Sequence, residues 1–414
     1  MLDLFLSKLN NYKDQIAFID SNRTHTYREL LESIDKKSSK MPSGQRKIQV
    51  VLVDHSFDTL CTLLALWLKK NTVLPISPEG IFSDQSNFIN EVENNTTLQL
   101  WQMKNRSGLL LMSSGSTGKA KFVLHDFDFF LERYHQQLPQ GFRVLDFYLW
   151  DHLAGLDVLF STLASGSVLI LPPKKNIYAI ESLIKNHSIS ILPITPTFLN
   201  LLFWEYRNRV FPQVEKVILG SEPMRASIQK MHTLFPNAQW VQKFGTTETG
   251  RIEGLRGSVK EGFALNPEKI QVRNNLLWVK CPKSLVGYIG KGDLEINGEW
   301  IGTGDVVTLQ NEGHFQITGR KDSFFNVGGE KIFPYPIEQT LQKHPQVLSA
   351  KVSGVPNPLM GTVLEAKILW EGECHSMTSQ LRKHCKSNRL PHMKIPVRFH
   401  RVNNLEYSSR FKQI

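Results

Sequence analysis

Ser113-Ser114-Gly115-Ser116-Thr117-Gly118-Lys119-Ala120-Lys121 is the most informative segment of this chain of 414 residues. It lies between two short apolar runs, 109–112 and 122–124, and this pattern predicts a strand, a tight polar loop and a second strand. Glycines let a backbone bend closely around an anion, hydroxyl groups can donate hydrogen bonds to it, and lysines offset its charge. We therefore interpret the segment as a phosphate-binding loop.

Two alternatives to this interpretation can be weighed from the sequence. A Walker A loop has Ser or Thr directly after its Gly-Lys pair, whereas Ala120 follows Gly118-Lys119 and Ser113 stands where the first glycine of that motif would be. The hydroxyl that would bind magnesium is therefore missing. A flexible linker is the other alternative, and the flanking strands and paired lysines argue against it.

The overall composition limits the class of protein. A length of 414 residues predicts two or three domains, and 41% hydrophobic with 21% charged residues is typical of a globular protein. No apolar run approaches the roughly 18 to 20 residues that cross a bilayer, and the first residues do not have the pattern of a secretory signal. We therefore expect a cytoplasmic protein without a membrane span.

Charge and cysteine usage indicate the kind of partner. The formal net charge of +11 favours anionic partners such as nucleotides, coenzyme A or an acidic carrier protein. Without a long Lys/Arg tract or a known nucleic-acid motif, we do not expect nucleic-acid binding. The cysteines at 61, 281, 374 and 385 form no CxxC pair, so we expect reduced thiols and no thiolate-bound metal.

Strand-like and helix-like segments alternate along the first 256 residues or so of the chain. This βαβ pattern predicts an α/β domain, in which 48–53 is a buried parallel strand. In such sheets, ligands bind outside the carboxyl ends of the strands, and several predicted strands end in glycine-rich or polar turns. Strands are expected at 15–20, 48–53, 73–76, 145–150, 168–171, 189–193, 216–219 and 239–242, and helices at 57–69, 158–163, 180–185, 196–204 and 226–234, with a further helix capped by Thr26.

The pattern changes at about residue 257. Short alternating strands with Gly and Asn turns predict antiparallel β structure from 257 to 315. A final α+β segment of about ninety residues then begins at Gly319-Arg320-Lys321-Asp322. We therefore expect two domains, comprising residues 1–320 and 321–414.

Several short motifs follow one another along the chain: 113–121, Gly220-Ser221-Glu222-Pro223, 242–248, Thr303-Gly304-Asp305, 319–322 and 405–412. Their order and spacing resemble those of the adenylate-forming superfamily, which contains acyl- and aryl-CoA ligases, non-ribosomal adenylation domains and luciferases. The resemblance runs from Thr26 to Lys412. It implies an α/β fold with a large N-terminal domain of stacked βαβ sheets and a small β-barrel-like part. A small, mobile α+β domain would follow and carry the catalytic lysine.

The resemblance implies a complete nucleotide site. The opening loop would hold the β- and γ-phosphates of ATP, with Ala120 and Phe122 replacing the usual proline and glycine. Thr247 would contact the α-phosphate and Glu248 a magnesium ion. Asp305 would bind the ribose and Arg320 the ribose or a phosphate. The matching loop positions are Ser113, Ser114, Gly115, Ser116, Thr117, Gly118 and Lys121, and those of the adenine site are Gly220, Ser221, Glu222, Gln242, Phe244 and Gly245.

Two of these positions also have a purely structural interpretation. Phe244 could simply pack in the core. Glu248 could be a solvated loop carboxylate, the commonest state of this residue type. Only their arrangement in space can separate the two interpretations.

The resemblance also implies residues on the side of the acid and of the acceptor. His152, in the motif His-x-x-Gly-Leu, would lie beside the substrate carboxylate. Leu153 stands where amino-acid-activating domains place an aspartate, so a simple carboxylic acid is expected. Asp322 would be the hinge between the domains, and Lys412 would stabilise charge as the adenylate forms. Gly328 and Gly329 would line the thiol tunnel, although a tight hairpin turn needs the same residues.

The expected function is that of an ATP-dependent carboxylic acid ligase, with ATP and Mg²⁺ in the first half-reaction. An acyl- or aryl-AMP intermediate would form first, and a thiol of coenzyme A or of a phosphopantetheinyl carrier would then displace AMP. Alternatives that share these motifs are a carrier-protein ligase, an amide-forming synthetase, a luciferase-like oxygenase and a non-catalytic nucleotide-binding module.

Overall fold

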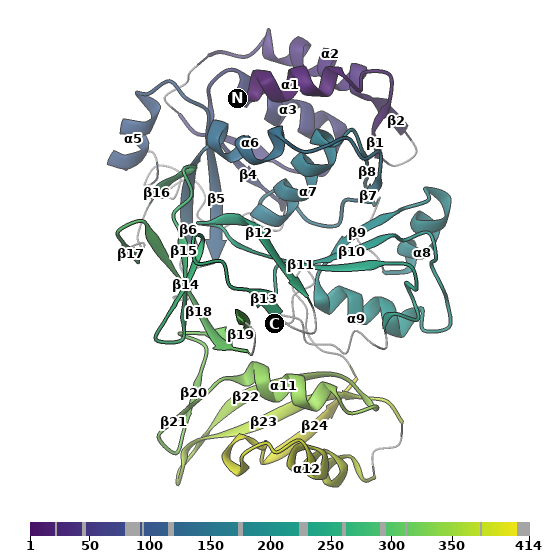
Figure 1. The fold of residues 1–414 in the computed structure, drawn as a ribbon, viewed down its shortest axis with the longest axis vertical. Helices are drawn as coiled ribbons and strands as arrows, with labels where there is room; N and C mark the ends of the chain where they lie inside the picture. The colour runs from purple at the N-terminus through teal and green to yellow at the C-terminus, as the bar shows by residue number, and fades with distance from the viewer. Residues whose placement is uncertain are drawn as a thin grey trace.

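The computed structural model describes most of the chain, and Figure 1 shows how its elements are arranged. Two large β-sheets and the helices around them form the upper part of the molecule in this view, and a smaller unit of later residues lies below. Every helix in these ranges is too short or too polar to span a lipid bilayer. The described residues are 1–20, 23–43, 47–78, 92, 95–114, 120–172, 177–222, 231–258, 262–289, 295–310, 313–372 and 375–403.

The smaller of the two large sheets contains the hairpin that was predicted around the phosphate-binding loop. Ser114 lies opposite Ala120 where the described parts of β5 and β6 end, which confirms the two predicted strands. Residues 115–119 lie outside the described ranges. The strand order is β16 (Leu285–Ile289), β6 (Ala120–Asp126), β5 (Gly108–Ser114), β4 (Thr72–Ile76) and β3 (Gln49–Leu52).

Two features of this sheet concern burial: the exposure of strand β3 and the position of Phe122 in β6. Strand β3 pairs with β4 in parallel, as predicted, but it lies at the edge of the sheet, and Val50 and Leu52 are 37% and 51% exposed. The prediction of a fully buried strand was therefore wrong, because an apolar run does not reveal whether a strand is central or at an edge. Phe122 is 1% exposed and packs with Leu110 and Leu124, so it fills the core rather than the loop.

The larger sheet joins the predicted parallel and antiparallel parts in one hydrogen-bonded array. Strands β7 to β11 pair in parallel, and β12 to β19 pair antiparallel. Its order is β14 (Ile270–Arg273), β15 (Leu276–Lys280), β18 (Trp300–Leu309), β19 (His314–Arg320), β13 (Gly262–Ala264), β12 (Gly250–Ser258), β11 (Gln239–Thr246), β10 (Lys216–Leu219), β9 (Ile191–Ile194), β7 (Arg143–Leu145), β8 (Val168–Ile170), β1 (Ile16–Asp20) and β2 (Arg23–Thr26), with β17 (Ile296–Asn297) beside β18.

The strand expected at 145–150 is shorter than predicted. Strand β7 ends at Leu145, and the buried carboxylate of Asp146 then accepts a hydrogen bond from Trp150 Nε1 at 2.6 Å. The chain turns into the interior at this point, so the apolar residues 147–150 are buried without pairing in a ladder. The helix expected at 158–163 begins earlier, at Leu153.

A layer of helices lies between the two sheets and forms the main core. Helices α3 and α6 pack on strands of the smaller sheet, and α7 packs on β8 and β12 of the larger one. Thr26 caps α2 through a reciprocal capping box with Glu29, as the sequence predicts. The helices of this layer are α1 (Leu2–Asn10), α2 (Tyr27–Ser38), α3 (Phe57–Leu68), α6 (Phe127–His135) and α7 (Leu153–Ala164), and α5 (Thr96–Gln102), α8 (Ile177–Asn186) and α9 (Pro196–Glu205) lie outside it.

The last described segment has a hydrophobic core of its own. Residues from Val327 to Phe399 form this core, separate from the main one, and it contacts α9 where Asn200 Nδ2 donates to the carbonyl of Leu348 at 3.2 Å. The domain boundary expected at residue 320 stays a prediction. The elements are β20 (Phe325–Val327), β21 (Glu330–Ile332), α11 (Pro334–Gln342), β22 (Val347–Asn357), β23 (Gly361–Trp370), α12 (Met377–Ser387), a 3₁₀ turn (His392–Lys394) and β24 (Arg398–Val402).

Substituting Gly155→Ala should destabilise the protein, although a glycine-to-alanine change inside a helix ordinarily stabilises by about 1 kcal/mol. A Cβ atom at Gly155 would lie 1.9 Å from the carbonyl oxygen of Leu149, and neither backbone can move away cheaply. We expect a loss of at least about 2 kcal/mol in urea unfolding, as in other overpacked cores. The neighbouring Ala154→Gly variant serves as control and should lose no more than about 1 kcal/mol.

Candidate active site

The turn between β11 and β12 carries two residues that were predicted to bind the nucleotide, Thr247 and Glu248. The backbone N–H groups of Thr246 and Thr249 each donate to the other residue's hydroxyl, at 3.1 and 3.2 Å. These hydrogen bonds close a compact turn, with Thr247 and Glu248 at its tip. Strand β11 lies inside the sheet, yet none of its residues is fully buried.

One face of strand β6 is directed at this turn. Every second residue of β6 lies on that face, namely Lys121, Val123 and His125. Tyr288 of β16 lies directly opposite Val123. Three polar side chains, those of Lys121, Tyr288 and His125, are thereby placed side by side. The sequence analysis identified only Lys121 among them.

His125 fastens the turn to the smaller sheet. Its Nε2 donates to the carbonyl oxygen of Thr247 at 2.7 Å, and Nδ1 lies 3.3 Å from the hydroxyl of Ser284, which can donate to it. The ring is fully buried, and this burial lowers its pKa to about 4. His125 is therefore neutral at pH 7 and has the donor that the carbonyl requires. A histidine four residues beyond Lys121, on the same face of a strand, was the available sequence signal.

Glu248 is held in place by Tyr288. The phenol hydroxyl donates to Oε1 of Glu248 at 2.6 Å, and burial followed by the charge of Glu248 raises the pKa of Tyr288. The ammonium group of Lys121 lies 5.6 Å from the centre of the Tyr288 ring, within the range of a cation–π interaction. Glu248 is thus not the freely solvated carboxylate that was considered as an alternative.

The predicted ribose residues form an adjacent pair. Asp305 and Arg320 are cross-strand neighbours of β18 and β19, and Arg320 Nη1 donates to Asp305 Oδ1 at 3.0 Å. Asp305 Oδ2 is buried and lacks a hydrogen-bond partner among the described residues. Burial raises the pKa of Asp305, Arg320 opposes this rise, and the charge of Glu248 adds to it. The two carboxylates of Asp305 and Glu248 therefore lie within electrostatic range of each other.

The adenine-side residues meet along strands β10 and β11. Gln242 pairs with Leu219 just before the Gly220-Ser221-Glu222 turn. Ser221 has φ of 70°, which a non-glycine residue adopts rarely. The carboxylate of Glu222 accepts a hydrogen bond from the N–H of Thr197 in the first turn of α9 at 2.8 Å. This carboxylate therefore anchors the turn to α9.

Phe244 has both of the properties that the sequence analysis left open. Its ring packs edge-on against Phe263 at a centroid distance of 5.9 Å and contacts the core of the antiparallel strands. Its side chain is nevertheless only partly buried. One part of the Phe244 ring therefore packs in a core, and another part stays exposed.

His152 is oriented by a residue that the sequence analysis passed over. Its Nδ1 donates to Asp151 Oδ1 at 2.8 Å, and the other oxygen of this buried carboxylate accepts from the hydroxyl of Ser77 at 2.6 Å. The rings of His152 and Tyr148 lie 6.3 Å apart, and the Tyr148 hydroxyl donates to the carbonyl of Gly220 at 3.4 Å. His152 is thereby linked to the adenine-side turn.

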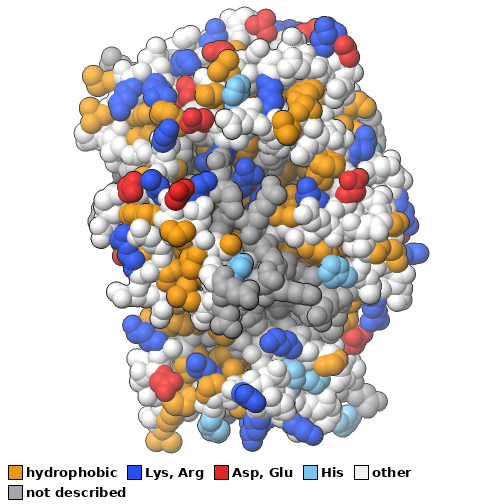
Figure 2. All heavy atoms as spheres, in the orientation of Figure 1, with side chains coloured by type: hydrophobic (Ala, Val, Ile, Leu, Met, Phe, Trp, Pro, Cys, Tyr) orange, Lys and Arg blue, Asp and Glu red, His pale blue; other side chains and the backbone are white. Residues whose placement is uncertain are grey.

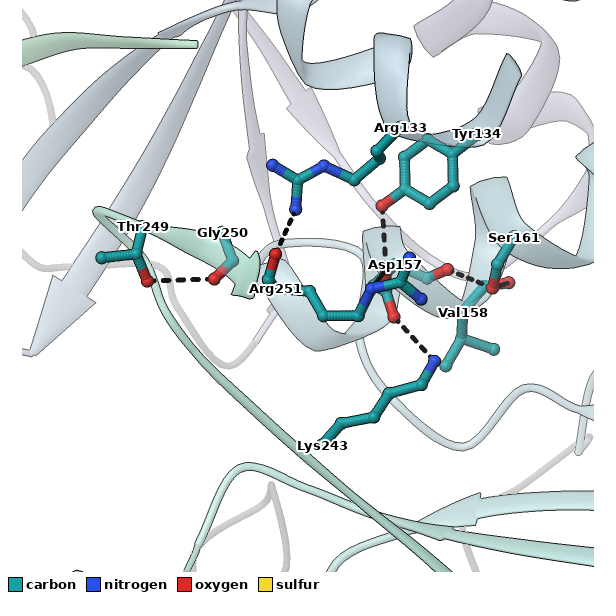
Figure 3. Close-up of polar contacts among 9 residues, drawn as sticks. All are labelled: Arg133, Tyr134, Asp157, Val158, Ser161, Lys243, Thr249, Gly250 and Arg251. Atoms are coloured by element: carbon teal, nitrogen blue, oxygen red, sulfur yellow. Dashed lines mark hydrogen bonds and ion pairs between the residues drawn. The ribbon is translucent and has the colours of Figure 1, made fainter. Parts of the chain in front are cut away.

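A buried ionic network supports β11 from the face opposite to Gln242 and Phe244 (Figure 3). Asp157 of α7 accepts from Lys243 at 3.1 Å and from the Tyr134 hydroxyl at 3.0 Å, and Arg251 Nε lies 3.5 Å from it. Burial alone would raise the pKa of Asp157, but Lys243 and Arg251 lower it to about 2. Asp157 is therefore ionised and joins α6, α7, β11 and β12 behind the site.

The remaining predicted positions are less informative. Gly328 and Gly329 have φ of 56° and 88° and form the two-residue turn between β20 and β21, so the hairpin alone explains both glycines. Asp322 is exposed in the turn between the two cores. Their roles as tunnel and hinge stay predictions. Lys412 and the loop residues Gly115, Ser116, Thr117 and Gly118 lie outside the described ranges, as do the side chains of Ser113 and Ser114.

Neutral, buried His125 should make stability depend on pH. Its folded-state pKa lies below the unfolded value, so this histidine lowers stability as the pH falls from about 6.5 to about 4, by on the order of 3 kcal/mol in total. His125→Gln keeps a donor near Thr247 but cannot titrate. We expect the variant to be less stable at pH 7.5 and the difference to shrink at pH 5 in urea unfolding. A difference that is constant over this range would contradict the assignment.

Comparison with known proteins shows which proteins this chain is similar to. Residues 83–253 match the family model described as AMP-binding enzyme. The chain is 26% identical over 333 residues to 2-succinylbenzoate–CoA ligase of Staphylococcus aureus (strain MRSA252) and 25% identical over 355 residues to that of Bacillus subtilis (strain 168). These matches cover 73% and 78% of this chain, but only 65% and 70% of the relatives' own length.

Solved structures show the same fold along nearly the whole chain. The o-succinylbenzoate CoA synthetase of Bacillus subtilis, in complex with ATP and magnesium, has a TM-score of 0.77 at 19% identity and covers 99% of this chain and 98% of its own. The amide bond synthetase McbA of Marinactinospora thermotolerans has a TM-score of 0.79 at 15% identity and covers 99% and 97%. Residues 83–253 are therefore similar to the AMP-binding enzyme family, and the chain as a whole has the fold of these solved structures.

Proposed function

We propose that this chain is an ATP-dependent carboxylic acid ligase that works in two half-reactions. The carboxylate oxygen of the acid attacks the α-phosphate of ATP, the bond to the β-phosphate breaks, and an acyl adenylate and pyrophosphate result. A thiol of coenzyme A then attacks the acyl carbon, and AMP leaves. Most of the rate acceleration in such chemistry comes from positioning and from charge stabilisation.

The observation that carries the proposal is the unpartnered oxygen of Asp305. A buried carboxylate oxygen without a donor is costly, and a ribose hydroxyl would supply the missing donor. Arg320 holds the other oxygen at 3.0 Å, so the carboxylate is already oriented. Glu248 lies within electrostatic range of Asp305, and Tyr288 contacts both Glu248 and Lys121. A nucleotide whose ribose binds Asp305 could therefore extend its phosphates toward Thr247 and Lys121.

The residues present also suit a magnesium ion. Mg²⁺ in nucleotide enzymes is usually bound through one or two carboxylates together with substrate phosphates. Within the described ranges, no group of three or more His, Cys, Asp or Glu side chains could hold a metal, and Glu248 is the candidate carboxylate beside the predicted phosphate position. When bound, the ion would neutralise phosphate charge. Glu248 would hold it, and Tyr288 would orient Glu248.

The acid would bind on the side of His152 and Gly220. Asp151 fixes the Nδ1–H tautomer of His152, which leaves Nε2 as an acceptor or, once protonated, a donor to the substrate carboxylate. The relatives are named 2-succinylbenzoate–CoA ligases, so an aromatic acid with coenzyme A as acceptor is our first choice. These names do not support a carrier protein as partner. Lys412 remains the proposed residue for stabilising the attack.

Exchange of labelled pyrophosphate into ATP tests the proposal directly. We expect exchange that depends on an added acid and on Mg²⁺, with 2-succinylbenzoate, benzoates, and short and long aliphatic acids as the panel. Product analysis with coenzyme A and with an amine as acceptors distinguishes a thioester ligase from an amide synthetase. If no acid supports exchange while nucleotide still binds, the chain is a binding module and the proposal is wrong.

Asp305→Ala should weaken the use of ATP by roughly 10- to 100-fold in kcat/KM, because a hydrogen bond to a charged group contributes about 1.5–3 kcal/mol. The unchanged protein should discriminate against 2′-deoxy-ATP or 3′-deoxy-ATP, and the variant should accept ATP and the deoxynucleotides equally. Asp14→Ala removes an aspartate that is 71% exposed and serves as control. Equal discrimination by Asp305→Ala and the unchanged protein would show that Asp305 does not bind the ribose.

A further inference from the structure

We propose that Tyr288 is a positioning residue that keeps the carboxylate of Glu248 and the ammonium group of Lys121 apart and presents both to a metal–triphosphate complex. This inference rests on the proposed function, because it assigns a role within the same site. It concerns a residue of β16, which lies far along the chain from both the phosphate-binding hairpin and the Thr247–Glu248 turn.

The geometry places Tyr288 between two opposite charges. Its hydroxyl lies 2.6 Å from Glu248 Oε1, and its ring lies 5.6 Å from Lys121 Nζ. An ionised carboxylate can only accept, so the phenol is the donor of this hydrogen bond. The hydroxyl of Tyr288 therefore contacts Glu248, and its ring lies near Lys121.

Two opposite charges that both lie beside one tyrosine could pair with each other if that side chain were absent. Such a pair would neutralise the lysine that is needed for phosphate and the carboxylate that is needed for the metal. In the part of the chain that the structure describes, no ion pair joins Lys121 to Glu248. A phenol hydroxyl orients the carboxylate without removing its charge, and an aromatic face attracts the ammonium group without neutralising it.

Core packing does not account for this tyrosine. Its neighbour Ile289 is 1% exposed and belongs to the core of the smaller sheet. Tyr288 is only half-buried and belongs to none of the hydrophobic clusters formed by the described residues. Its polar atom and its ring face are both engaged with the two charged groups, which points to a role in the site.

Two substitutions separate the functions of the hydroxyl and the ring. Tyr288→Phe removes the hydrogen bond to Glu248 and keeps the ring beneath Lys121, whereas Tyr288→Leu removes both. We would measure binding of α,β-methylene-ATP by calorimetry, with and without Mg²⁺, so that the readout does not depend on turnover. Tyr206→Phe, which removes the hydrogen bond of a buried phenol to the carbonyl of Ile177, is the matched control.

We expect Tyr288→Phe to bind the metal-free nucleotide within about twofold of the unchanged protein and to lose about tenfold of the enhancement that Mg²⁺ provides, the size of a hydrogen bond to a charged group. Tyr288→Leu should also weaken metal-free binding, because Lys121 can then pair with Glu248. Adding Glu248→Gln to Tyr288→Leu should restore metal-free binding, since the lysine is released. The control should change neither quantity.

Other results would overturn the inference. Equal loss of metal-free and metal-dependent binding in Tyr288→Phe would indicate a general structural defect, and an unchanged response to Mg²⁺ would mean that the hydroxyl does not position Glu248. If the Tyr288→Leu variant does not fold, the Tyr288→Phe result alone decides. Failure of the proposed function is a different outcome, because no acid would then support pyrophosphate exchange in the unchanged protein.

Discussion

The hydrogen bond from His125 to the carbonyl of Thr247 joins the two large sheets where the candidate site is formed. His125 follows the phosphate-binding hairpin in the smaller sheet, and Thr247 lies at the tip of the β11–β12 turn in the larger one. Because the ring is buried and neutral, this contact is both strong and sensitive to the protonation of a single nitrogen.

The candidate site is therefore built by two sheets, and each would supply part of the proposed nucleotide-binding surface. The smaller sheet contributes Lys121 and Tyr288, and the larger one contributes Glu248, Asp305 and Arg320. Behind β11, the buried Asp157 holds Lys243 and Arg251 on the opposite face of the strand (Figure 3). A strand that is anchored from one side can present its other side to a ligand without losing its position.

On the face shown in Figure 2, Lys and Arg side chains are not concentrated in one place. Lys and Arg side chains are spread over both the upper and the lower part of the face shown in Figure 2, with acidic side chains among them in the upper part. The net charge of +11 thus gives a general attraction for anions. Selectivity for a nucleotide would come from the few groups inside the site, such as the unpartnered oxygen of Asp305.

The sequence by itself determined the order of most strands and helices and the hairpin around the predicted phosphate-binding loop, because periodicity, caps and turn residues act over short distances. Most of the candidate nucleotide residues came from its resemblance to the adenylate-forming superfamily. The sequence placed a strand at 145–150 and buried β3 on both faces, because apolar runs do not reveal their partners. Only the tertiary structure decided which side chains meet. Tyr288 and His125 come to Glu248 and Thr247 through strand pairing and the contact between sheets, and neither depends on neighbours in the sequence.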